Sequence, residues 1–264
     1  MRKLIFIIIC SFWCVAALAR QNYSSVDQYA ADAPILQDAD KLEDLVHYLV
    51  RRYKRDEDKA RVLLSWIVHN IDYDWYKYHK NQQAKNNPNA QIEVPQSDIL
   101  ETRLGICSDI AALYQRMGHL AGLEVEVITG KTMDAQYTLE QFEGSSLEHA
   151  WNAVKINGDW QYVDPTWAIG GTDAYEPTDI TSQRDYDKMI KRREKRHSSI
   201  TKPRSGRAVK DEWFLTDKDE MIKTHLPNDE KWQLQDKKLT KEQFLKQANP
   251  RAYRALIRRE RRKK

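Results

Sequence analysis

Cys107 is the residue with the clearest potential for chemistry. It lies in "RLGICSDIAALYQRMGHLAG", between a chain-breaking glycine and the first turn of an expected helix. The positive end of a helix dipole favours a thiolate, and a backbone N–H at a helix start can serve in an oxyanion hole. Nucleophilic catalysis by a thiol also needs a base and a third group that orients the base. The chain must therefore bring two further residues to this cysteine.

A hairpin downstream supplies candidates for both roles. Asn157-Gly158 separates two runs of aromatic and β-branched residues in "HAWNAVKINGDWQYVDPTW", a pattern typical of a two-residue type I′ turn. The register that this turn sets places His149 and Asp164 on one face of the hairpin as diagonal neighbours. Such neighbours stand roughly 7–8 Å apart at the backbone, within reach of an imidazole and a carboxylate. The turn alone therefore predicts a His–Asp pair.

We predict that Cys107 is the nucleophile, that His149 is the base, and that Asp164 fixes the tautomer of His149 and stabilises its imidazolium. Each residue also has an ordinary alternative. A cysteine near a helix start is more often a small buried hydrophobe, a lone histidine on a strand is usually structural, and an Asp before Pro is commonly a turn residue. Their joint occurrence favours catalysis, because two independent signals bring them together.

The N-terminus indicates an export signal. Two basic residues precede an apolar run over residues 4–18, which ends in a small-x-small pattern. We expect residues 1–19 to be a secretory signal peptide and the protein to be periplasmic or secreted. The run is short for a membrane-spanning helix, although an uncleaved anchor is the alternative. Cys10 and Cys14 lie inside this segment, so its removal would leave Cys107 as a lone thiol in a fold without an internal disulfide.

Elements around the predicted triad follow the order of helices first and strands afterwards. With 41% apolar and 10% aromatic residues, the 264-residue chain can bury a sizeable core. The patterns predict helices over residues 42–53 and 56–71, a surface loop over Lys80–Gln91, a short helix ended by Gly105, a helix from Cys107 and a strand over residues 123–129. This order is typical of an α+β domain with a mainly antiparallel sheet, which we assign to residues 20–250.

The net charge of +4 hides a segregation of charge along the chain. Gln183–Lys210 carries eleven Lys/Arg against three Asp/Glu, and Arg251–Lys264 carries eight against one. We therefore expect a basic insertion at about 183–210 and a basic C-terminal tail at 251–264 on an acidic body. A solvated charged surface is the ordinary interpretation, and contact with an anionic envelope surface or an acidic protein is the next. Nucleic acid is not expected, because export and the acidic remainder oppose it.

Cofactor and metal sites are not expected. Once the expected signal peptide is set aside, one cysteine and seven scattered histidines provide no paired-ligand spacing of the zinc type, and glycine-rich phosphate loops are absent from the sequence. His225 and Trp232, in "THLPNDEKWQL", are expected to pack rather than to react.

Two blocks, "RLGICSDIAALYQRMGHLAGLEVEVITG" and "HAWNAVKINGDWQYVDPTWAIGG", resemble the core of the transglutaminase-like superfamily of papain-type cysteine enzymes. The flanks "DKARVLLSWIVHNIDYD" and "EWFLTDKDEMIKTHLPNDEKWQL" resemble its kyphoscoliosis-peptidase branch, so the resemblance covers about Lys41 to Phe244. It implies a papain-like α+β fold and a Cys-His-Asp triad at Cys107, His149 and Asp164. The chain departs from the pattern in the Ser-Asp after the cysteine and in the long basic stretch before Trp213.

The resemblance implies chemistry through a thioester that leads to cross-linking, deamidation or peptide hydrolysis, while some relatives serve as scaffolds. We expect an exported cysteine enzyme that acts on amide bonds of peptides or proteins, with hydrolysis favoured over cross-linking. The alternative is a non-catalytic interaction module held to its partner by the basic segments. The donor that completes the oxyanion hole is not identified by the sequence, since Tyr73 and Trp75 could equally be core aromatics.

Overall fold

The computed structural model describes residues 22–33, 42–96, 98–170, 182–197 and 207–263. The predicted signal peptide, residues 1–19, lies outside the described residues, as do parts of the predicted basic insertion. Within the described ranges, no helix is both long enough and apolar enough to cross a bilayer.

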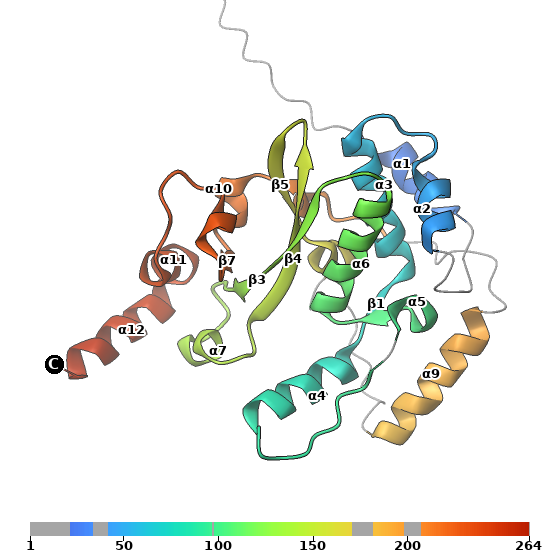
Figure 1. The fold of residues 1–264 in the computed structure, drawn as a ribbon. Coiled ribbons are helices and arrows are strands. Elements are labelled where there is room, and N and C mark those ends of the chain that lie inside the picture. Colours follow the sequence, from blue (N-terminus) through green and yellow to red (C-terminus); the bar gives the residue numbers. More distant parts are fainter. Residues whose placement is uncertain (1–21, 34–41, 97, 171–181, 198–206, 264) are drawn as a thin grey trace, which may run out of the picture.

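Helices fill the N-terminal half of the described chain (Figure 1). They are α1 (Ser24–Ala31), α2 (Leu42–Val50), α3 (Asp56–Asn70), α4 (Trp75–Asn86), α5 (Ile99–Thr102) and α6 (Cys107–Leu120). The helices predicted from apolar periodicity, α2 and α3, and the helix predicted to begin at Cys107 are confirmed. Every residue of α3 from Ala60 to His69 is buried, because α1, α2 and α6 surround this helix in the main hydrophobic core.

The predicted surface loop over Lys80–Gln91 is wrong for its first half, because α4 continues to Asn86. The Asp74 side chain caps the N-terminus of this helix by accepting a backbone hydrogen bond. The polar residues that resemble a loop in the sequence bind another segment instead, as Gln82 does with Ser145. Tertiary hydrogen bonds thus stabilise a helix that lacks an apolar periodicity.

The short helix before Cys107 also ends earlier than predicted. Arg103 adopts the left-handed conformation at the end of α5, with φ of 57°, so Gly105 is not the residue that terminates the helix. Gly105 belongs to β2 (Leu104–Gly105), which pairs in parallel with β1 (Asp72–Tyr73). This pairing places Tyr73 beside the chain that enters α6.

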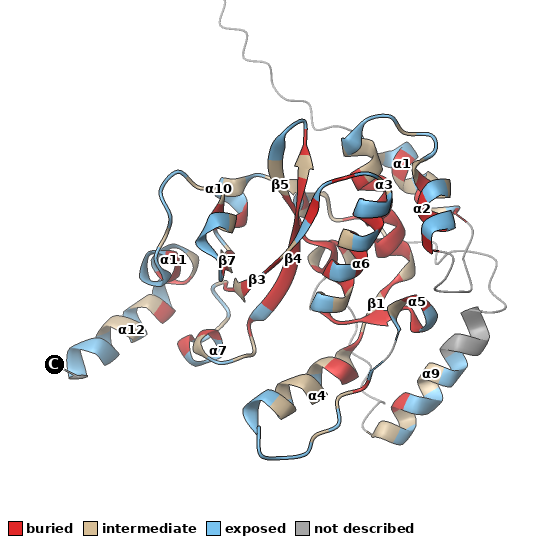
Figure 2. Cartoon of the chain, viewed as in Figure 1, coloured by how far each residue is buried: buried red, intermediate tan, exposed pale blue. Residues whose placement is uncertain are grey.

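A five-stranded antiparallel sheet forms the second layer. Its strands are β3 (Val125–Thr132), β4 (Glu148–Ile156), β5 (Asp159–Val163), β6 (Phe214–Thr216) and β7 (His225–Pro227), in the spatial order β6-β5-β4-β3-β7. Helix α6 packs against β3 and β4, and buried residues concentrate where the helices meet the sheet (Figure 2). The predicted α+β class with an antiparallel sheet is confirmed.

The β4–β5 hairpin has the predicted register. Ile156 pairs with Asp159, and both residues of the Asn157-Gly158 turn have positive φ, 53° and 94°, as a type I′ turn requires. Asp164 directly follows β5 and caps α8 (Pro165–Ile169). The turn therefore fixes where the strand ends and where the aspartate lies.

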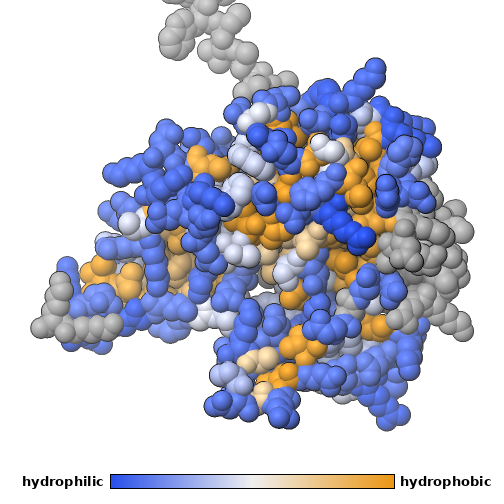
Figure 3. All heavy atoms as spheres, viewed as in Figure 1, coloured by the Kyte–Doolittle hydropathy of each residue, from blue (hydrophilic) through white to orange (hydrophobic). Residues whose placement is uncertain are grey.

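The remaining elements lie around the edges of the two layers (Figure 1). They are α7 (Leu139–Glu143), α9 (Gln183–His197), η3 (Asp211–Trp213), α10 (Lys218–Met221), η4 (Glu230–Gln233), α11 (Lys241–Ala248) and α12 (Pro250–Lys263). A second, smaller core joins α7, α11 and α12, where Phe142 stacks on Phe244 at 5.8 Å. Helix α12 projects from the body (Figure 1), and on the face shown in Figure 3 hydrophobic residues gather in the middle while hydrophilic residues dominate the remainder.

Candidate active site

Cys107 is the first residue of α6 and is half-buried at the edge of a cavity. The Asp109 carboxylate holds the first turn of this helix. It accepts a hydrogen bond from the Ile106 backbone N–H at 3.0 Å and forms an ion pair with Lys77 at 2.8 Å. The thiol therefore lies at the N-terminal end of a fixed helix, where the dipole and free N–H groups favour negative charge.

The hairpin brings His149 and Asp164 into direct contact. His149 Nε2 lies 2.7 Å from Asp164 Oδ2, and the carboxylate has no exposed surface. The other carboxylate oxygen accepts the Trp167 backbone N–H at 2.9 Å, the capping bond of α8. Because Nε2 faces Asp164, Nδ1 is the ring nitrogen left for Cys107, whose thiol lines the same cavity and helps to raise the pKa of this imidazole. All three residues that the sequence singled out thus meet at one place.

The His149 imidazolium and the Asp164 carboxylate stabilise each other's charge. Burial alone would lower the pKa of His149, but the Asp164 carboxylate, with a contribution from Cys107, raises that pKa to about 10. Burial alone would raise the pKa of Asp164, yet His149 and His225 lower it well below its ordinary value. The buried pair is therefore an imidazolium and a carboxylate at neutral pH.

His225 reaches the same carboxylate, a contact that the sequence did not indicate. Its Nε2 lies 3.1 Å from Asp164 Oδ2, and its Nδ1 lies 2.8 Å from the Thr224 hydroxyl. The expectation that His225 packs is confirmed, because this fully buried ring contacts several tryptophans, but it also makes a hydrogen bond at the site. His225 is 61 residues from Asp164 in the chain, and only the pairing of β7 with β3 brings the two together.

The nitrogen and oxygen atoms of His149, Asp164 and His225 that could bind a metal ion all lie within 4.8 Å of one another. Two ligands of a tetrahedral zinc ion, with bonds near 2 Å, lie about 3.3 Å apart. The 2.7 Å separation of His149 Nε2 and Asp164 Oδ2 is shorter and is a hydrogen-bond distance. We therefore interpret the three residues as a hydrogen-bonded cluster.

A cavity of 170 Å³ opens beside Cys107 and His149. Its walls include the aromatic residues Tyr73, Trp75, Tyr78, Tyr137 and Trp167. The Trp75 Nε1 atom is buried and has no hydrogen-bond partner among the described residues. Burial raises the pKa of Tyr73 well above its ordinary value, so its hydroxyl stays protonated. Both residues that the sequence left as candidate donors thus line the cavity.

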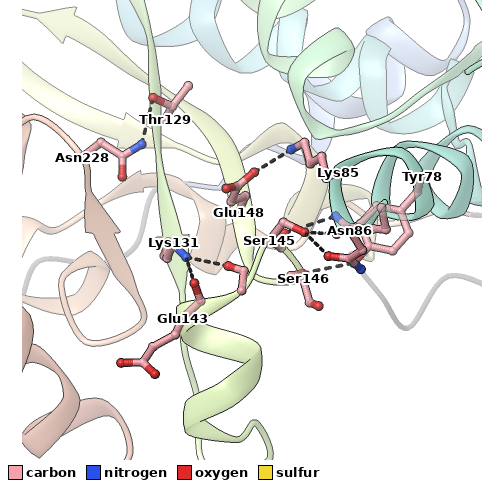
Figure 4. Close-up of polar contacts among 12 residues, drawn as sticks. Tyr78, Lys85, Asn86, Thr129, Lys131, Glu143, Ser145, Ser146, Glu148 and Asn228 are labelled. Atoms are coloured by element: carbon pink, nitrogen blue, oxygen red, sulfur yellow. Dashed lines mark hydrogen bonds and ion pairs between the residues drawn. The ribbon is translucent and has the colours of Figure 1, made fainter. Parts of the chain in front are cut away.

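Polar contacts hold one wall of this cavity in place (Figure 4). From α4, the Tyr78 hydroxyl donates to the Ser146 carbonyl at 3.1 Å, and Lys85 forms an ion pair with Glu148 at 2.5 Å. From β3, the Lys131 ammonium donates to two carbonyls at the C-terminal end of α7, at 2.7 and 2.6 Å. The segment that leads into β4 is therefore fixed from two sides.

Comparison with known proteins places this geometry in a family. Residues 43–165 match the model of the transglutaminase-like superfamily, a range that includes Cys107, His149 and Asp164 and stops before β7. The core of this chain is a transglutaminase-like domain. The sequence resemblance described above and the α+β architecture agree with this assignment.

Two curated relatives are distant homologues of this chain. Human kyphoscoliosis peptidase is 27% identical over 218 residues, which are 83% of this chain and 27% of that protein. Hillarin of Drosophila melanogaster is 27% identical over 235 residues, 84% of this chain and 24% of that protein. The chain thus spans about a quarter of the length of these relatives. A solved structure of a TGase, 16% identical, has a TM-score of 0.37 and covers 66% of this chain and 39% of its own.

Replacing Asp164 with asparagine should lower the pKa of His149 by about 1 to 3, since the carboxylate charge is what holds the proton on the buried ring. An NMR pH titration of the His149 imidazole measures this change directly. Asp134→Asn, at an exposed turn that does not contact the site, serves as the control. Titration of His149 at the same pH in Asp164→Asn and in the wild type would contradict the assigned electrostatics.

Proposed function

We propose that this chain is a cysteine acyl-transfer enzyme that acts on amide bonds of peptides or proteins. The observation that carries the proposal is the position of His149, whose ring bonds the buried Asp164 carboxylate and lines the same cavity as the Cys107 thiol. This arrangement provides a nucleophile, a base and an orienting group in one cavity.

The reaction follows from these positions. Cys107 Sγ bonds to the carbonyl carbon of the substrate, and His149 Nδ1 holds the thiol proton. The tetrahedral intermediate then breaks its C–N bond as His149 protonates the leaving amine, which leaves a thioester on Cys107. Water, deprotonated by His149, attacks the thioester and releases the carboxylic acid and the free thiol. Asp164 keeps the ring in one tautomer and stabilises its positive charge throughout.

Hydrolysis is proposed over cross-linking. The human relative is named a peptidase, and the transglutaminase-like core supports acyl transfer in general. The two outcomes differ only in whether water or a substrate amine attacks the thioester.

The products formed from peptides test the proposed activity. A diverse peptide library incubated with the full chain should yield products by mass spectrometry, and Cys107→Ala, which lacks the nucleophile, should yield none. An added primary amine separates the two outcomes, because a transamidase would form the corresponding amide and a hydrolase would form the acid. Identical product profiles for the wild type and Cys107→Ala would contradict the proposal and favour the non-catalytic scaffold.

Trp75 is proposed as an oxyanion donor together with the Cys107 backbone N–H, because its buried indole N–H lines the cavity and has no partner among the described residues. Trp75→Phe keeps the ring and removes the N–H, so we expect kcat to fall about 10²–10³-fold. Trp160→Phe is the matched control, since Trp160 packs on Trp232 and does not line the cavity. Equal kcat values for the two variants would contradict this role.

We further propose that the protein is exported and that α12 binds an anionic surface. Support for export lies in the sequence of residues 1–19. Support for binding lies in the exposed side chains of Arg258, Arg261 and Arg262, for which the described residues provide no acidic partner.

Retention of the full chain on vesicles that contain anionic lipid should fall steeply as salt is added, because screening weakens contacts between exposed charges. Replacing Arg258, Arg261 and Arg262 with glutamine should reduce retention at low salt. Salt-insensitive retention, or equal retention on neutral vesicles, would contradict the electrostatic interpretation.

A further inference from the structure

We propose that His225 is a positioning residue of the active site, and that β7 completes the site by holding Asp164 in the orientation that His149 needs. This inference rests on the proposed function, because it assigns a role within the same reacting group. It also concerns a residue outside residues 43–165, the range that the family model matches.

The first support is the hydrogen bonding of Asp164. Oδ2 accepts His149 Nε2 at 2.7 Å and His225 Nε2 at 3.1 Å, while Oδ1 accepts the Trp167 backbone N–H at 2.9 Å. The carboxylate has no exposed surface, so these protein groups take the place of water. Without His225, the oxygen that faces His149 would lose one of its two donors, and the carboxylate would be held only by its capping bond and by the group that it must orient.

The second support is the protonation state that the surroundings impose on His225. The Thr224 hydroxyl lies 2.8 Å from Nδ1 and can donate to it, which leaves the proton on Nε2, the nitrogen that faces Asp164. Burial lowers the pKa of His225, and the neighbouring His149 lowers it further, although Asp164 acts in the opposite direction. His225 is therefore a neutral donor. Its hydrogen bond orients the Asp164 carboxylate without adding a second positive charge that would compete with the His149 imidazolium.

The third support is the rigid enclosure of the His225 ring. The ring centroids of Trp167 and Trp151 lie 4.5 and 4.9 Å from that of His225, and Trp213 lies at 5.7 Å. These contacts restrict rotation of the imidazole and exclude water from its bond to Asp164.

The backbone of β7 is held equally closely. His225 pairs with Thr132 of β3, and a Cβ built on Gly130 would lie 2.3 Å from the Leu226 carbonyl oxygen. Only glycine at position 130 allows β7 to approach β3 this closely. The distance between His225 and Asp164 is thus set by the sheet and does not depend on a flexible loop.

Substrate-independent reactivity of Cys107 tests the proposal. The rate of alkylation by iodoacetamide is measured against pH in the full chain, together with an NMR titration of His149. His225→Phe keeps a ring in the tryptophan enclosure but has no donor. We expect alkylation of Cys107 in this variant to be about tenfold slower at mildly acidic pH. Loss of the His225 hydrogen bond should misorient Asp164 and lower the pKa of His149 by about one, which weakens the thiolate–imidazolium pair by that factor.

A matched pair of amides separates positioning from folding. His225→Gln can place an amide N–H near the position of Nε2, whereas the shorter His225→Asn cannot, and the two changes are otherwise similar. We expect the His225→Gln variant to retain the wild-type dependence of Cys107 alkylation on pH, and the His225→Asn variant to lose it. The control is His69→Phe, a buried histidine on α3 whose ring bonds the Ser65 carbonyl, and it should lower Tm without moving the profile.

The outcomes distinguish this proposal from the proposed function. Alkylation that is unchanged in His149→Ala would overturn the function itself. If alkylation depends on His149 but His225→Phe behaves as the wild type, the function stands and the role of His225 is overturned. If His225→Phe does not fold, the His225→Gln and His225→Asn variants test the proposal instead. Equal dependence of Cys107 alkylation on pH in these two variants would overturn it.

Discussion

The buried carboxylate of Asp164 is the constraint around which this structure is organised. A carboxylate without solvent costs several kcal/mol unless donors and an opposite charge offset the loss of hydration. Here the donors come from three elements that are separate in the chain, β4 through His149, the first turn of α8 through Trp167, and β7 through His225. The hairpin, the helix that follows it and the distant edge strand must therefore all be in place before the charge is satisfied.

Each of the two layers of the fold provides a different catalytic group. The helical layer presents Cys107 at the start of α6, and the sheet presents His149 from β4, which packs directly against that helix. The cavity between them is walled by aromatic side chains, and its neighbouring loop is tied to α4 by hydrogen bonds and by the pair of Lys85 with Glu148. Walls of this kind limit water at the site, and the scarcity of water strengthens the interaction between the imidazolium and its carboxylate.

Local rules made much of the site predictable from sequence. The Asn157-Gly158 dipeptide fixes a two-residue turn, and that turn alone determines that His149 and Asp164 share a face. The helix that begins at Cys107 is likewise set by its own sequence. His225 was not predicted as part of the site, because its contact depends on the pairing of β7 with β3 and no spacing rule connects it to Asp164. Helix α4 was partly missed for a similar reason, since its polar second half is stabilised by bonds to a distant segment.

The proposed chemistry depends most on Cys107 acting as a nucleophile that His149 activates. Intact-mass measurement of the chain during reaction with an activated acyl ester tests this claim most directly. We expect an acyl adduct on Cys107 that forms and then hydrolyses in the wild type, and that forms far more slowly in His149→Ala. Absence of the adduct, or equal rates of acylation in the wild type and His149→Ala, would contradict the account.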